Sequence, residues 1–364
     1  MSKMKRIILL GLAAVAALAS CKRSTVAPRP TIPLVLSVSA DTTGAGRVAA
    51  EAGAIGAAGS IAIIGEPLDA ILLARYFQSA DRRDNVDGRP VRDSLPDFAG
   101  ETFEVILDAY NEPYSHFVTE GPQAAMRLDS LREAAVQNAL YAWDSTCVRT
   151  PAKILVYASS LQAEYGQFDV DTLQQLTGGQ SILLSPVHVL LDQAYAEGAR
   201  HMAVWTSEKV RSSGAWQAVF AGKGWSDATL SVLTPEPALD IRTELRSFLR
   251  QYRAGGKKLD VLLLDKYDFT PSYLQSELDL IRKAGTEEDD SFNRLLSPDF
   301  RFMEPKSALV QATYSLLRER RLFTHRILRP TVHFYETDES AQGMPILEEV
   351  SAAYVQTAYV SDIH

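Results

Sequence analysis

The chain has 364 residues, of which 46% are hydrophobic and 23% are charged, so it is long enough for two globular domains with apolar cores. Its formal net charge of −8 argues against a nucleic-acid partner, because such proteins carry a basic surface that neutralises phosphates. The composition also excludes a chain that is disordered throughout.

The first 20 residues have the pattern of an export signal. Three basic residues within the first six positions precede a short apolar run over residues 7–17, and Leu-Ala-Ser stands directly before Cys21. The run is too short for a stable transmembrane helix. Leu-Ala-Ser-Cys resembles a bacterial lipobox, which implies a signal peptide at 1–20 and lipidation of Cys21. We therefore expect a cell-envelope lipoprotein, anchored to a membrane that faces the periplasm or the exterior. A plain signal peptide with a chance cysteine is the alternative.

Residues 21–58 have the composition of a linker. They are first rich in proline and then in alanine and glycine, which favours a flexible tether between the anchor and the folded body. Residues 33–38 could form one short strand within it. The run 42–47 lacks the Gly-Lys-Ser/Thr ending of a phosphate-binding loop.

The next elements form a strand, loop, helix and strand at the spacing of a βαβ unit. A first strand over 60–64 and a helix over 68–77 lead through a polar insertion to a strand that ends at Asp108. A helix over 129–143 and a strand over 153–157 follow. In an open parallel sheet, ligands bind just past the carboxyl ends of the strands. Four polar residues stand at such ends: Asp108, Tyr114, Ser159 and Ser160.

The rest of the chain continues to alternate between strands and helices. Further strands are expected over 181–184, 202–205, 230–233, 259–264, 301–303 and 332–335, with helices over 167–178, 187–196, 241–252 and 307–319. This order predicts an α/β fold with mainly parallel sheets.

Two motifs are similar to those of a known family. Asp108 is followed five residues later by Pro113-Tyr114, and the run from Thr206 to Gln217 is similar to a Thr-x-x-Thr-Val-x-Ser-Gly-Ala-Tyr-Gln element with Lys209 at the second threonine. The arrangement resembles the glutamate racemase family of the aspartate/glutamate racemase superfamily, in order from about residue 60 to residue 338. The resemblance implies two racemase-like domains around a cleft, the first over 59–178 and 296–364 and the second over 179–295.

The chain departs from the family at three places that carry its chemistry. The family has Ala-Cys-Asn-Thr where this chain has Ala-Ser-Ser-Leu over 158–161, and Gly-Cys-Thr-His where it has Asp-Lys-Tyr-Asp over 265–268. Its first strand ends in Gly-Glu-Pro rather than Asp-Ser-Gly. Catalytic candidates at the thiol and histidine positions are therefore Ser159, Lys266 and Asp268. Candidate ligand-binding residues are Asp108, Pro113, Tyr114, Ser160, Thr206 and Lys209.

These departures exclude ordinary racemisation by two thiols. That reaction needs two groups of moderate pKa on opposite sides of the α-carbon, and an unactivated serine hydroxyl is too weak a base. A desolvated Lys266 with Asp268 could act as a base instead. The plainer alternative is that Asp265, Lys266 and Asp268 pair with one another at the cleft.

The remaining reactive residues do not predict a metal or a cofactor. The six histidines are scattered without metal-ligand spacing, and there is no dinucleotide fingerprint, Walker loop or nucleophile elbow. Cys147 stands before the strand at 153–157, at its amino end, which is the wrong end for a catalytic residue in this fold.

Three functions remain open from the sequence. The leading hypothesis is an envelope lipoprotein that lacks racemase activity and binds a small anionic ligand, such as an acidic amino acid, between its domains. The second is an active, cofactor-independent isomerase of the superfamily that uses Lys266 and Asp268. The third is a periplasmic-type solute-binding lipoprotein, whose chain would cross between the domains three times.

Overall fold

The structure is a computed structural model that describes residues 29–85, 88–120, 124–252, 257–284, 286–324, 326, 328–341 and 343–360. The expected signal peptide and Cys21 lie outside these residues. None of the helices in the described part combines the length and the apolar character needed to cross a membrane.

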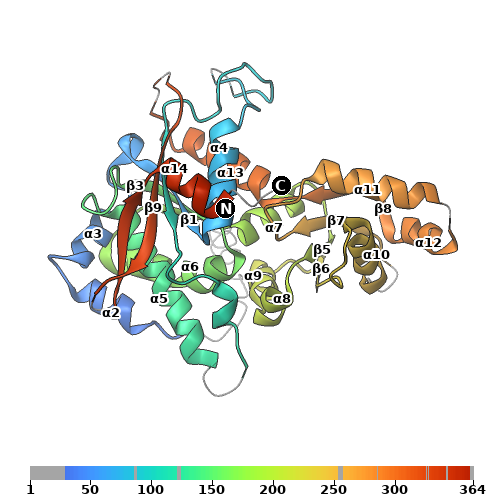
Figure 1. Cartoon of the computed structure of the whole chain (residues 1–364), viewed down its shortest axis with the longest axis horizontal. Helices are drawn as coiled ribbons and strands as arrows, with labels where there is room; N and C mark the ends of the chain where they lie inside the picture. The colour runs from blue at the N-terminus through green and yellow to red at the C-terminus, as the bar shows by residue number, and fades with distance from the viewer. Residues whose placement is uncertain are drawn as a thin grey trace, which may run out of the picture.

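A six-stranded sheet forms domain A (Figure 1). Its strands lie in the order β10-β9-β2-β1-β3-β4, and all neighbours are parallel except the β9–β10 hairpin. The bounds are β1 Ser60–Gly65, β2 Thr102–Leu107, β3 Ala152–Tyr157, β4 Ile182–Leu184, β9 Thr331–Glu339 and β10 Pro345–Val350. Every residue of β1 and β3 is buried, which explains the apolar runs over 61–64 and 154–157 within them.

Helices cover both faces of this sheet. Ile61 and Ile63 of β1 pack with α4 and α13 in one core, whereas Ala62 and Ile64 pack with α5 and α6 in another. The bounds are α4 Pro67–Ser79, α5 Ala124–Trp143, α6 Ser160–Thr177 and α13 Pro305–Glu319. After β10, the chain ends its described part in α14 (Ala352–Val355) and a π-helical turn (Gln356–Val360), which pack against the first of these cores.

A four-stranded parallel sheet, β6-β5-β7-β8, forms domain B. Figure 1 shows it beside domain A with α10, α11 and α12 at its far end. Its bounds are β5 His201–Trp205, β6 Thr229–Leu233, β7 Leu259–Leu264 and β8 Leu296–Met303. Its helices are α7 Pro186–Ala196, α8 Glu208–Ser213, α9 Ala215–Lys223, α10 Ile241–Gln251, α11 Pro271–Ala284 and α12 Glu287–Leu295. One face packs on α10 to α12 and the other on α7 and α9.

The division between the domains differs from the expected boundaries. β4 pairs with β3 and belongs to domain A, whereas β8 pairs with β7 and belongs to domain B. The strand near residue 301 therefore completes the second sheet and does not return the chain to the first, because Arg301 to Met303 align with Val261 to Leu263. Among the described strands, the chain passes between the sheets twice, after β4 and after β8. A periplasmic-type plan would require three crossings.

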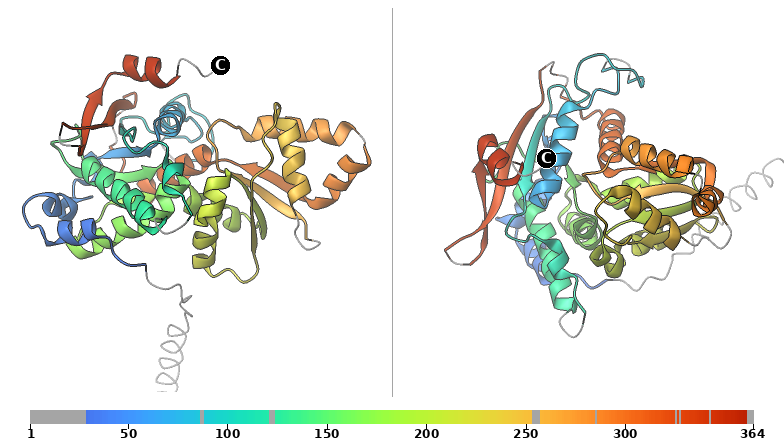
Figure 2. Two further views of the ribbon diagram at one scale, coloured as in Figure 1. Left: turned by 60° about the horizontal axis from the view of Figure 1, so that its bottom comes forward. Right: turned by 45° about the vertical axis from the view of Figure 1, so that its right-hand side comes forward.

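The expected linker is folded over much of its length. Residues 33–38, considered as a strand, lie in helix α2 (Pro33–Ala40), and α3 (Ala45–Glu51) follows with a 3-10 turn at Gly56–Ala58. Figure 2 shows both helices lying against domain A. Small residues serve packing here rather than flexibility, because a Cβ on Gly46 would come within 1.7 Å of the Asp41 carbonyl oxygen. Ala49 is fully buried against the second core of domain A.

Candidate functional site

The carboxyl end of β3 meets the carboxyl end of β7 at the boundary between the domains. Ser160 Oγ, in the first turn of α6, donates a hydrogen bond to Asp265 Oδ1 at the end of β7. Thr206 Oγ1 donates to Asp265 Oδ2 at 2.5 Å, and the indole Nε1 of Trp216 donates to the same oxygen at 3.2 Å. Burial raises the pKa of Asp265, while these three donors oppose that rise. Asp265 therefore joins the two domains.

Tyr267 makes a second direct contact across the same boundary. Its hydroxyl donates to the carbonyl oxygen of Ala158 at 2.6 Å, and its ring belongs to the apolar core of domain A. The ammonium of Lys306, at the start of α13, donates to the Tyr267 carbonyl oxygen. The hydrogen bonds of Tyr267 with Ala158 and with Lys306 thus hold the loop after β7 against domain A.

A group of carboxyl side chains surrounds this boundary. Burial, followed by the nearby charges of Glu66, Asp265, Asp268 and Glu112, raises the pKa of Asp69 to about 8. Glu66 accepts a hydrogen bond from the Tyr114 backbone N–H at 3.0 Å, yet burial still raises the pKa of Glu66. Burial also raises the pKa of Glu112. At neutral pH, Asp69 therefore holds a proton most of the time.

Lys266 and Asp268 do not form the expected ion network with Asp265. The Lys266 ammonium lies 4.9 Å from the centre of the Phe269 ring, and no described residue forms a hydrogen bond or ion pair with it. Asp268 is exposed. Asp265 is instead satisfied by the hydroxyls and the indole described above, so the pairing expected from sequence is wrong. Lys266 is consequently available to a ligand.

Ser159 caps a helix. Its Oγ accepts a hydrogen bond from the backbone N–H of Leu161 at 3.3 Å, which satisfies one of the unpaired donors at the start of α6. The side chain is 7% exposed. No described basic group contacts this hydroxyl, so nothing in the described part of the chain activates it as a nucleophile.

Asp108 and Tyr114 lie inside domain A. The fully buried Asp108 carboxylate accepts four side-chain hydrogen bonds, from Asn111 Nδ2 at 2.8 Å, Tyr114 Oη at 2.7 Å, Asn138 Nδ2 at 2.8 Å and Thr337 Oγ1 at 2.9 Å. Burial raises the pKa of Asp108 and the four donors oppose the rise. These donors come from the loop after β2, from α5 and from β9, so Asp108 connects three parts of the domain.

The remaining candidates lie at the edge of the boundary. Pro113 follows a cis peptide bond and precedes the 3-10 turn Tyr114–Phe117. Thr206 is buried beneath Asp265. Lys209 is exposed in α8, and its ammonium donates to the Val118 carbonyl oxygen at 3.2 Å, which links domain B to a loop of domain A. Of the candidates, Lys266 and Asp268 therefore have the most freedom to meet a ligand.

Comparison with known proteins gives one kind of match. No family model matches the chain, and no curated protein sequence matches it. The glutamate racemase of Francisella tularensis subsp. tularensis SCHU S4, solved in complex with D-glutamate, matches with a TM-score of 0.50 and 14% identity, over 79% of this chain and 91% of that chain. The fold is that of the aspartate/glutamate racemases.

Two further racemase structures match at the same level. The glutamate racemase of Thermus thermophilus in complex with beta-chloro-D-alanine has a TM-score of 0.49 and 14% identity, over 79% of this chain and 91% of that chain. The RacE1 isoform of Bacillus anthracis has a TM-score of 0.49 and 13% identity, over 78% and 90%. The resemblance seen in the sequence is confirmed for the fold, which is the α/β arrangement with mainly parallel sheets that we expected.

In this racemase fold, the single described cysteine lies away from the domain boundary. Cys147 is half-buried between α5 and β3, near the amino ends of the strands, and burial raises the pKa of its thiol. The described residues include no group of three or more His, Cys, Asp or Glu placed to hold a metal ion.

Sequence reasoning missed the cluster of carboxyl side chains around Asp69. In the sequence, Glu66 stands out only as a departure from the family, and Asp69 and Glu112 do not stand out. A usable signal was present, because Gly-Glu-Pro-x-Asp directly after a buried strand puts two carboxyls at the carboxyl end of the sheet. The sequence did not show that Asp265 and Asp268, which follow β7, would lie close enough to raise the pKa of Asp69.

Proposed function

We propose that this protein is a lipid-anchored envelope protein that binds a small ligand of the acidic amino-acid type between its two domains and does not racemise it with two thiols. The observation that carries this proposal is the cluster of carboxyl side chains of Glu66, Asp69 and Glu112 without a basic partner, together with Lys266, which follows Asp265 at the end of β7. No described basic side chain forms an ion pair with Glu66, Asp69 or Glu112. A cluster of carboxyl side chains without a basic partner favours a ligand that carries a positive charge.

An amino acid carries an ammonium and a carboxylate, which are the partners that the carboxyl cluster and Lys266 lack among the described residues. Its α-ammonium would lie against the carboxyl groups of Glu66 and Asp69, and a carboxylate would lie against the Lys266 ammonium. The Francisella racemase was solved with D-glutamate, which makes acidic amino acids the first ligands to test. The negative surroundings of Asp69 select for the ammonium, so a simple dicarboxylate without an amino group should bind less well.

The absence of a two-thiol reaction rests on the residues at the family's cysteine positions. Ser159 is occupied as a helix cap, and the other position is Lys266. Cys147 is at the opposite end of β3. Thiol groups therefore do not supply the base and the acid of moderate pKa that would have to face each other across the α-carbon.

One observation favours the alternative of an active isomerase. A carboxyl group whose pKa lies at about 8 can hold and release a proton near neutral pH, and Asp69 is such a group at a ligand-binding end of the sheet. Asp69 with Lys266 would then move a proton at the α-carbon. This reading demands α-proton exchange, whereas binding alone does not.

Anchoring belongs to the same proposal and rests on the sequence of residues 1–21. A Cys21→Ser variant should lose incorporation of radiolabelled palmitate and should move from the membrane fraction to the soluble fraction. Unchanged labelling in that variant would exclude Cys21 as the lipid site.

Calorimetric titration with L- and D-glutamate and aspartate tests the binding. We expect Lys266→Ala to weaken binding by about tenfold, since a charge-assisted hydrogen bond is lost. The matched control is Lys257→Ala, which removes an exposed lysine just before β7. Affinity should rise from pH 7 to pH 9, because the ammonium binds the ionised form of Asp69. Succinate, which lacks the amino group, is the comparison ligand.

Solvent-deuterium incorporation at the α-carbon separates the two candidates. Binding without exchange supports the proposed function. Exchange that disappears in Lys266→Ala and Asp69→Asn would replace it with the isomerase. No binding of any of the four amino acids, with the fold intact by circular dichroism, would refute both.

A further inference from the structure

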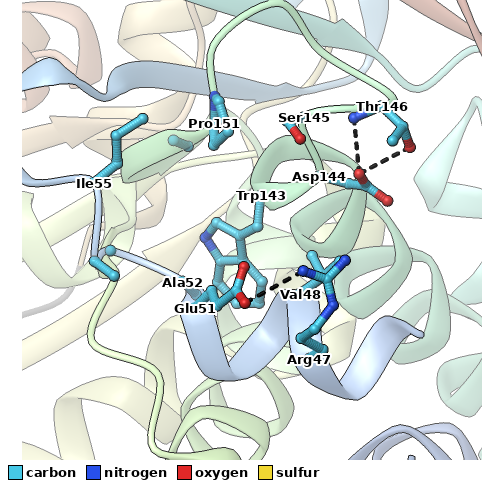
Figure 3. Close-up of a pocket in the computed structure, with 13 residues that line it drawn as sticks. Arg47, Val48, Glu51, Ala52, Ile55, Trp143, Asp144, Ser145, Thr146 and Pro151 are labelled. Atoms are coloured by element: carbon cyan, nitrogen blue, oxygen red, sulfur yellow. Dashed lines mark hydrogen bonds and ion pairs between the residues drawn. The ribbon is translucent and has the colours of Figure 1, made fainter. Parts of the chain in front are cut away.

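A cavity lies at the opposite end of domain A from the domain boundary. It has a volume of about 410 Å³ and lies between α3, the turn at 52–55, the end of α5 and the residues that lead into β3 (Figure 3). Since β3 begins at Ala152, the cavity is at the amino ends of the strands. The cavity is therefore separate from the cluster of carboxyl side chains around Asp69.

An unpaired hydrogen-bond donor faces this cavity. Trp143, the last residue of α5, is 5% exposed, and its indole Nε1 is buried without a hydrogen-bond partner among the described atoms. Figure 3 shows the indole nitrogen directed toward the side of the cavity where Ile55 and Pro151 lie. A buried N–H without a partner is costly, and buried indoles normally have one. An acceptor that enters the cavity would remove that cost.

The walls of the cavity are held in place before any ligand enters. Ala54 N–H donates to the Glu51 carbonyl oxygen at 3.0 Å, and Gln180 N–H donates to the Ala52 carbonyl oxygen at 2.8 Å. Gly53 has a φ of +79°, and a Cβ there would come within 2.6 Å of the Gln180 backbone. On the other side, Asp144 accepts from the Thr146 N–H at 2.8 Å. A preformed cavity lowers the cost of binding.

The lining selects for a largely apolar, neutral ligand. Val48, Ala52, Ile55 and Pro151 supply apolar walls around the Trp143 indole, and the exposed residues Ser145 and Thr146 add hydroxyl groups to the lining. At the mouth, Arg47 and Glu51 pair at 3.3 Å and are both well exposed, so they neutralise each other. We propose that this cavity is a second binding site, which takes a small, mainly apolar molecule whose carbonyl or ring-nitrogen acceptor receives the Trp143 N–H.

Coumarin and naphthalene make a matched pair of probes, because they have similar flat bodies and only coumarin has a carbonyl. The readout is the indole N–H resonance of Trp143 in nitrogen-15-labelled full-length protein. The chain has four tryptophans, so the resonance is identified by its loss in Trp143→Phe. We expect coumarin to shift this resonance downfield in a saturable way and to bind about tenfold more tightly than naphthalene.

Two variants and one control decide the outcome. Trp143→Phe keeps an aromatic side chain in the wall but removes the donor, so coumarin should bind about tenfold more weakly and naphthalene about equally well. Ala54→Leu adds volume at an exposed position of the lining and should weaken both probes. Trp225→Phe, in domain B, should change neither.

Each contrary result counts against the site. Equal coumarin affinity in wild type and Trp143→Phe would show that the indole is not the contact. If no probe moves the resonance up to its solubility limit, and the indole proton exchanges with a bound water, the donor is only hydrated and the proposal fails.

Discussion

Replacing Asp69 by asparagine tests the electrostatics of the domain boundary most directly. Asp69 lies in the first turn of α4, where the helix dipole normally favours a carboxylate. Burial and four neighbouring acids outweigh the dipole and raise its pKa from 3.8 to about 8. Because the native state keeps a proton that the unfolded state releases, this group's contribution to stability is lost as the pH rises from 3.8 to about 8.

The size of this loss follows from the two pKa values. At about 1.36 kcal/mol per pH unit, the interval from 3.8 to about 8 corresponds to about 6 kcal/mol. Asp69 keeps partial contact with solvent, which screens its neighbours, so we expect about half of that value, ~3 kcal/mol. Asparagine carries no charge at any pH. Asp69→Asn should therefore be more stable than wild type above pH 8 and should lose this advantage toward pH 4.

Urea unfolding of both proteins between pH 5 and pH 9 measures the difference. Asp299→Asn is the control, because it removes one negative charge from an exposed position of β8. If Asp69→Asn and wild type keep parallel stability curves, the reasoning is wrong. A carbon-13 titration of the Asp69 carboxyl with a midpoint near 4 would refute it independently.

Three further substitutions test buried contacts of domain A. Tyr114→Phe removes one of the four donors to Asp108 and should lower the free energy of unfolding by about 2 kcal/mol; a loss below ~0.5 kcal/mol would contradict the buried bond. Lys153→Met leaves the buried Glu101 carboxylate without the ammonium 2.6 Å away and should cost about 3–5 kcal/mol in urea unfolding, most of it restored if Glu101 is also made glutamine. Burial is the main cause that raises the pKa of Glu104 from 4.5 to about 7, so the free energy of unfolding of wild type should fall by up to ~3 kcal/mol between those pH values. Glu104→Gln should remove this pH dependence. If the free energy of unfolding of the variant changes with pH as in wild type, Glu104 is not the group responsible.

The strands were predictable because buried parallel strands have a simple sequence signature. Both faces of β1 and β7 are covered, so each contains a continuous apolar run, over 61–64 and 261–264, that can be recognised without long-range information. β8 lacks such a run, and its membership in domain B depends on pairing with β7, which composition does not encode. The helix α3 was missed because alanine and glycine suggest flexibility in an isolated segment, whereas here they permit close packing.

At the candidate site, the sequence predicted positions but not directions. Thr206, Ser160 and Lys266 do lie at strand ends near the boundary between the domains. Which of them turns toward a partner depends on residues from a distant part of the chain. Ser160 and Thr206 bond to Asp265 across or beside the boundary, and Lys266 does not. Only the assembled sheets show that Lys266 has no hydrogen-bond or ion-pair partner among the described residues.

The Asp108 motif that carried the resemblance also contributes to the stability of the fold. Asp108 and Tyr114 bond to each other in the interior, and Asp108 also holds Asn138 of α5 and Thr337 of β9. Loss of any of these contacts would leave a buried carboxylate short of donors, so the motif is constrained by stability. No such constraint applies to Lys266, whose ammonium lies over the Phe269 ring and has no hydrogen-bond or ion-pair partner among the described residues. Folding therefore constrains the Asp108 motif more strongly than it constrains position 266, which is occupied by a lysine in this chain.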